Sequence, residues 1–73
     1  MLKVFPTGVA VETSVVNAIR CMAVGVKNMP RYEVQALIGS EWVFIAKFGQ
    51  AQKESALDYI EQVASEINGG KNG

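Results

Sequence analysis

The chain has 73 residues, which is the size of one domain and too short for two. Seven basic and seven acidic residues cancel, so no overall field attracts nucleic acid or an anionic membrane. The absence of histidine and the single cysteine exclude an intrachain disulfide, a conventional zinc module and a Ser-His-Asp or Cys-His catalytic arrangement. Because so small a core supplies little stability, oligomerisation is the expected supplement.

The N-terminal residues predict two short strands joined by a turn. Residues 2–5 and 9–12 are largely apolar, and Pro6-Thr7-Gly8 between them has the composition of a turn. Pro6 also interrupts the first apolar run, which is too short for a signal peptide. We therefore expect this segment to belong to the folded domain.

Residues 13–24 fit either a strand or a helix. The β-branched pair Val15-Val16 favours a strand, whereas Ala18 and Met22 favour a helix that would end at Gly25. We expect the strand, and the alternative is a β-α-β-β-α order with a helix at about residues 13–24. Residues 27–30 then form a loop, because a proline disfavours helical backbone in the residue before it.

Residues 32–38 and 42–48 predict a β-hairpin, because both are rich in β-branched and aromatic residues. The Gly39-Ser40 pair between them suits a two-residue type II′ turn. The register set by this turn pairs Ile38 with Glu41, Ala36 with Val43, and Val34 with Ile45.

This register gives the hairpin two apolar faces. The first face carries Val34, Ala36, Ile38, Val43 and Ile45. The second carries the candidate interface residues Leu37, Trp42, Phe44 and Phe48. One helix covers only one side of a sheet, so a helix on the first face leaves the second in need of another cover. Either the N-terminal strands curl over the second face, or it makes an interface with a protein.

Residues 51–68 predict an amphipathic helix. Its apolar stripe consists of Ala56, Leu57, Ile60, Val63, Ala64 and Ile67. The carboxylates of Glu54, Asp58 and Glu61 lie on the opposite, polar side, where we expect solvent rather than acid–base chemistry or a bound cation. Asn68-Gly69-Gly70 predicts the end of the helix. We expect a single domain over residues 1–68 and a flexible tail over 69–73.

These elements predict an α+β fold, with a small antiparallel sheet or partly closed barrel of four to five strands and a C-terminal amphipathic helix. The pattern resembles small bacterial and phage proteins with a pleckstrin-homology-like arrangement, in which short strands precede one helix. The residues that carry the resemblance are Gly8-Val9-Ala10-Val11, Val16 with Ile19, Tyr32-Glu33-Val34, and Ile45-Ala46-Lys47-Phe48. It implies an accessory protein, and it does not define an activity.

The expected function is that of a non-enzymatic interaction protein, either a homo-oligomer or one that binds another protein. We expect no catalytic residue, cofactor, metal or small-molecule substrate. We also expect no membrane partner, because no segment approaches the roughly 18 apolar residues of a membrane span. The unpaired Cys21 fits a reducing compartment, which predicts the cytoplasm.

The alternative function is binding of single-stranded nucleic acid on an aromatic sheet face. Bases would stack on Trp42, Phe44 and Phe48. The candidate phosphate contacts are Arg20, Arg31 and Lys47. Residues 1–53 hold six basic and three acidic residues, a net charge of +3, which permits this reading. The zero net charge of the whole chain and the scarcity of basic residues along the aromatic strand disfavour it.

Overall fold

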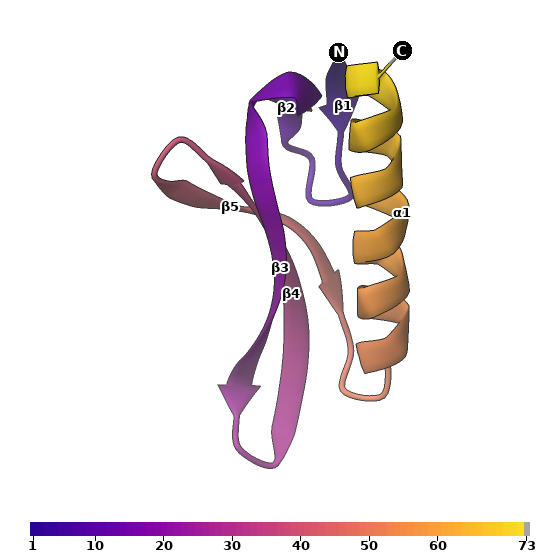
Figure 1. Cartoon of the computed structure of the whole chain (residues 1–73). Coiled ribbons are helices and arrows are strands. Elements are labelled where there is room, and N and C mark those ends of the chain that lie inside the picture. Colours follow the sequence, from indigo (N-terminus) through magenta and orange to yellow (C-terminus); the bar gives the residue numbers. More distant parts are fainter. Residues whose placement is uncertain (73) are drawn as a thin grey trace.

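The computed structural model describes the backbone of residues 1–72 and the side chains of residues 1–69 (Figure 1). Its elements are strands β1 (Leu2–Val4) and β2 (Ala10–Glu12), a 3₁₀ turn (Thr13–Val15), strands β3 (Val16–Val26), β4 (Met29–Ile38) and β5 (Glu41–Phe48), and helix α1 (Lys53–Asn72). All strand pairs are antiparallel. The predicted α+β class, with a small antiparallel sheet and a C-terminal helix, is confirmed.

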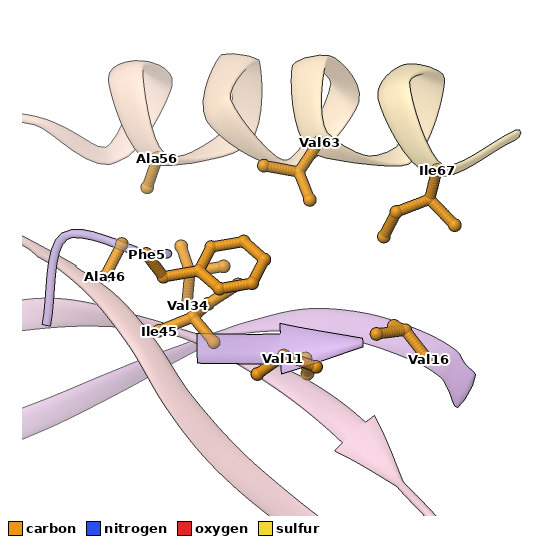
Figure 2. Close-up of a cluster of buried hydrophobic side chains, with 10 residues drawn as sticks. Phe5, Val11, Val16, Val34, Ile45, Ala46, Ala56, Val63 and Ile67 are labelled. Atoms are coloured by element: carbon orange, nitrogen blue, oxygen red, sulfur yellow. The ribbon is translucent and has the colours of Figure 1, made fainter. Parts of the chain in front are cut away.

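The strands form two separate sheets, one of β1 and β2 and one in the order β3-β4-β5. The larger sheet is not closed into a barrel, so the barrel that the sequence left open as an option is wrong. The reason lies in the N-terminal hairpin, which packs beside α1 instead of joining β3 to β5. Its Phe5 is buried between the helix and the β4 and β5 residues Val34 and Ile45 (Figure 2).

A tight turn positions Phe5 for this burial. The Phe5 N–H donates to the Val9 carbonyl at 2.9 Å, and the Gly8 N–H donates to the Phe5 carbonyl at 2.8 Å. Gly8 has a φ of +93°, which glycine adopts without the steric cost that other residues bear. The predicted strand–turn–strand is therefore confirmed. The expectation that these strands cover the second face of the hairpin is wrong, because Phe5 and Val11 join the core on the helix side.

The ambiguous segment is a strand, and the helix at about residues 13–24 is wrong. Only one 3₁₀ turn forms, at Thr13–Val15, where the Glu12 carboxylate accepts the Ser14 N–H. The Met1 ammonium and that Ser14 N–H lower the pKa of Glu12. Strand β3 then pairs along nearly its whole length with β4. This pairing stabilises the strand, whereas an isolated helix of about 12 residues is only marginally stable in water.

The predicted loop at residues 27–30 is shorter in the structure, because β4 already begins at Met29. Pro30 lies within β4, opposite Gly25 of β3. A proline is tolerated there because β5 ends at Phe48, opposite Tyr32, so β4 has no neighbour on its other side at Pro30.

The β4–β5 hairpin contains a β-bulge. The turn lies at Gly39-Ser40, as predicted, with φ of +63° at Gly39. The predicted pairs Ile38 with Glu41 and Ala36 with Val43 are confirmed. The predicted pair of Val34 with Ile45 is wrong, because Val34 pairs with Ala46 and Ile45 becomes an extra residue.

Helix α1 covers the first face of the hairpin. Ala56, Val63 and Ile67 are buried in one cluster with Phe5, Val34 and Ile45 (Figure 2). Leu57 departs from the predicted stripe, since its side chain is 46% exposed. Tyr59 takes part instead, with its ring centroid 5.7 Å from that of Phe48. Burial raises the pKa of the Tyr59 hydroxyl, an effect that Lys3 opposes and Glu66 reinforces.

The helix extends to Asn72, beyond the predicted end at Asn68. Gly69 does not adopt the positive φ that would terminate a helix. Residues 69–72, which were predicted as part of a flexible tail, therefore belong to the helix. Gly73, the last residue of that predicted tail, lies outside the described residues. Near this end, Lys3 of β1 and Glu66 of α1 form an ion pair of 2.6 Å between Nζ and Oε2.

Candidate functional site: the open face of the sheet

The side of the β3-β4-β5 sheet turned away from α1 is the candidate site, and we call it the open face. Side chains alternate between the two sides of a strand, so the observed register identifies its members. They are Ala18, Arg20, Met22 and Val24 of β3, Arg31, Glu33, Gln35 and Leu37 of β4, and Trp42, Phe44 and Lys47 of β5. The residues of opposite parity, such as Ile19 and Val43, pack against the core on the helix side.

Large apolar side chains gather at the end of the open face that lies beside the Gly39-Ser40 turn. Trp42 is 36% exposed and Phe44 38%. Leu37 lies directly opposite Trp42 and is half-buried, while Met22 of β3 is 36% exposed. Helix α1 and the N-terminal residues Phe5 and Val11 pack on the other side of this sheet. The Pro6-Thr7 turn borders the open face at Phe44 and Lys47. Three of the four candidate interface residues, Leu37, Trp42 and Phe44, therefore share one accessible surface.

Phe48, the fourth candidate interface residue, lies on the opposite side. The bulge at Ile45 shifts the alternation by one residue, so Ala46 and Phe48 turn toward α1 and Lys47 turns away from it. The contact of Phe48 with Tyr59 confirms this orientation. No local signal in the sequence marks the bulge, because residues 42–46 are all apolar and show no break in an alternating pattern.

A polar network crosses the open face from β3 to β4. Arg20 lies over Trp42, with its guanidinium carbon 3.9 Å from the ring centroid. Arg20 Nε donates to Gln35 Oε1 at 2.9 Å, and Gln35 Nε2 donates to Glu33 Oε1 at 3.3 Å. The guanidinium is thus held by a hydrogen bond and a cation–π contact together. It covers one side of the indole and presents a fixed positive charge beside it.

The other two candidate basic residues also belong to the open face. The bulge brings Lys47 opposite Glu33, and Arg31 is exposed opposite Val24. With Arg20 they make three positive charges against the single negative charge of Glu33. The structure thus groups all three candidate basic residues with Trp42 and Phe44, which the predicted register did not do for Lys47.

The chemical groups away from the open face are dispersed. Glu54, Asp58 and Glu61 are exposed on α1, as predicted. Among the side chains that the structure describes, no three carboxylates or thiols lie close enough together to hold a metal ion. Cys21 is half-buried on the helix side of β3. Within the same part of the chain, no helix combines the length and the apolar composition needed to cross a membrane.

A groove runs between the start of β3 and the C-terminal half of α1. Its volume is about 190 Å³. The lining comes from Val16, Asn17, Ala18 and Ile19 of β3 and from Ile60, Ala64, Ile67 and Asn68 of α1. The sequence did not predict it, because the groove exists only where the edge of the sheet and the helix meet.

Comparison with known protein families, curated proteins and solved structures found no match to this chain. The resemblance to the pleckstrin-homology-like proteins, and the bacterial or phage origin that it implies, therefore stay predictions. The chemistry of the open face is the remaining basis for a functional proposal.

Proposed function

We propose that this protein is a non-enzymatic interaction protein of the cytoplasm that binds another protein through the open face. The observation that carries the proposal is the cluster of Leu37, Trp42 and Phe44, which remains accessible although α1 covers the other side of the sheet. Clusters of large apolar side chains on a surface mark interaction sites. The unpaired thiol of Cys21 favours the reducing compartment.

The charges of the open face favour a partner surface that has an apolar patch with acidic residues next to it. Arg20, Arg31 and Lys47 outnumber Glu33, so the face has a net charge of +2 beside its apolar end. Aromatic residues and arginine are also the types most enriched among residues that dominate binding energy. Acidic residues beside the apolar patch of the partner would speed association and fix its orientation.

Photo-cross-linking tests the proposal. We would replace Phe44 with benzoylphenylalanine in the cell that produces the protein, and use the same replacement at Leu2 as the control, because Leu2 is exposed on β1 and belongs to neither the open face nor the β3 edge. We expect one discrete protein adduct from position 44 and none from position 2. The purified partner should then bind at least about tenfold more weakly to the Lys47→Glu variant than to the unmodified protein.

Two outcomes would contradict this proposal. Equal adducts from both positions would show that the open face has no special role. An adduct with a second copy of the chain would assign the face to self-association instead of a different protein. Circular dichroism of Lys47→Glu must remain that of the parent, which we expect because Lys47 is exposed.

Binding of single-stranded nucleic acid is the second candidate function, because the bulge brings Lys47 onto the same face as Trp42 and Phe44. Against it, Arg20 already covers one side of the indole on which a base would stack. Titration with a labelled oligothymidine at low salt discriminates the two functions. Quenching of Trp42 fluorescence that disappears at high salt would favour the nucleic acid.

A further inference from the structure

The outer edge of β3 is the longest unpaired strand edge in the described part of the chain. Strand β3 has 11 residues and pairs only with β4. Arg20 is its one charged residue, and it contains no proline. Such an edge is a template for another strand, and proteins commonly protect theirs with charges, prolines or covering loops.

The opposite edge of the same sheet, formed by β5, is protected by hydrogen bonds from the N-terminal hairpin. At β5, the Thr7 hydroxyl donates to the Phe44 carbonyl at 2.9 Å, and the Thr7 N–H donates to the Ile45 carbonyl at 3.3 Å. The Pro6–Gly8 turn thus covers the β5 edge at the bulge. Within residues 1–72, no comparable backbone bond from a loop or strand reaches the outer edge of β3.

The groove beside β3 offers an apolar surface to whatever pairs with this edge. Ile19 of β3 and Ile60 of α1 both line it. The strand and the helix run in opposite directions (Figure 1). Two residues along β3 from Ile19 advance about 6.6 Å, and about one turn back along α1 from Ile60 covers about 5.4 Å in the same direction. Cys21 is therefore level with Leu57, and the exposed Leu57 side chain continues the apolar surface along the edge.

The residues of β3 are compatible with antiparallel pairing between this strand and the same strand of a second copy. Its regularly paired residues run from Ala18 to Val24, with Cys21 at the centre. A two-fold axis at Cys21 sets Arg20 opposite the partner's Met22 and Ile19 opposite the partner's Ala23, so no like charges meet across the edge. An axis at Arg20 would set the two guanidinium groups against each other.

The charges on α1 are arranged about Leu57, which is level with Cys21. Lys53 and Glu61 lie one turn before and one turn after Leu57. A two-fold axis normal to the sheet keeps both helices on one side and makes them antiparallel. If the helices approach at Leu57, Lys53 is placed beside the partner's Glu61, and Glu61 beside the partner's Lys53. One two-fold axis thus suits both the strand pairing and the helix charges.

We propose that two copies of the chain join through antiparallel pairing of their β3 strands about a two-fold axis at Cys21. The product is a continuous six-stranded sheet with both α1 helices on one side and two open faces on the other. The proposal depends on the β3 edge and its groove, not on the open face, so it can fail or hold independently of the proposed function. It also supplies the oligomerisation expected of a chain with so small a core.

Disulfide cross-linking tests the register. Under mild oxidation with copper–phenanthroline, Cys21 should cross-link two chains rapidly, because the axis places the two thiols side by side. The control is Cys21→Ala combined with Val24→Cys, a half-buried position on the same strand. In the proposed register that residue faces the partner's Ala18, so its cross-linking should be at least about tenfold slower. Equal rates would overturn the register.

Sedimentation in reducing buffer tests the association itself. The full chain should sediment at twice its monomer mass of 7.9 kDa. Ala23→Lys places a charge on an exposed position of the edge, which should weaken the dimer at least about tenfold while circular dichroism stays unchanged. Phe44→Glu on the open face should leave the dimer intact. A chain that stays monomeric at about 1 mM, or a dimer indifferent to Ala23→Lys, would overturn the proposal.

Discussion

Phe44 and Ile45 show how sharply the environment changes between neighbouring residues of β5. Ile45 has no exposed surface and belongs to the core, whereas Phe44 is 38% exposed on the open face. The larger of the two side chains is thus the one left at the surface. In a protein of this size, that arrangement is a cost to solubility, and it favours a function for the exposed ring.

We predict that Ile45→Ala lowers the free energy of unfolding by about 2–5 kcal/mol, because it leaves a cavity beneath α1. Phe44→Ala should lower it by about 1 kcal/mol or less, since the ring is partly solvated and has no helix above it. Urea denaturation followed by far-ultraviolet circular dichroism measures both at one protein concentration. Equal losses would mean that Phe44 belongs to the core, which would remove the basis of the open face.

At the scale of elements, two glycines occupy opposite backbone environments. Gly39 begins the β4–β5 turn with a φ of +63°. Gly69 lies inside α1 without a positive φ, and a methyl group added there would meet no other atom within 4 Å. The first glycine is required by its turn, while the second weakens its helix by its flexibility in the unfolded chain.

The same substitution should therefore act in opposite directions at these positions. Gly69→Ala should raise the free energy of unfolding by up to about 1 kcal/mol, through helix propensity. Gly39→Ala should lower it by about 1–2 kcal/mol, because alanine bears the steric cost of a left-handed backbone. Thermal and urea unfolding of the two variants give the signs. A loss of stability in Gly69→Ala would contradict a helix that continues through residue 69.

At the scale of the whole molecule, the N-terminal hairpin is attached to the rest by a few specific contacts. Phe5 is 2% exposed and lies between α1 and the larger sheet (Figure 2). The ion pair of Lys3 with Glu66 joins the N-terminal hairpin to the C-terminal half of α1. Since both side chains of this pair are partly solvated, we expect Phe5 to dominate the attachment.

We predict that Phe5→Ala lowers the free energy of unfolding by about 3–5 kcal/mol. Leu2→Ala on the same hairpin is the control and should change it little, because Leu2 is 68% exposed. In the parent protein, Trp42 fluorescence and the helical signal at 222 nm should follow one transition, since a single core connects the sheet and α1. Two separate transitions would show that the sheet and the helix are independent units.

Much of this fold could be predicted from local patterns. The helix, the Gly39-Ser40 turn, the N-terminal turn and the antiparallel hairpin follow from periodicity and turn chemistry, which act over a few residues. The candidate site was only partly predictable. Leu37, Trp42 and Phe44 share a face because they precede the bulge, whereas Phe48 and Lys47 follow it and exchange sides. Segment 13–24 was ambiguous because only pairing with β4 selects the strand.

The sequence by itself determined the elements outside residues 13–24, the exclusion of histidine chemistry and of internal disulfides, and the apolar character of both hairpin faces. Only the tertiary structure decided where the bulge lies, which face α1 covers, and that the N-terminal hairpin packs on the helix side. The physical reason is that these choices depend on burying Phe5, Ile45 and Ala46 together against α1. That burial joins residues far apart in the chain, and no local pattern encodes it.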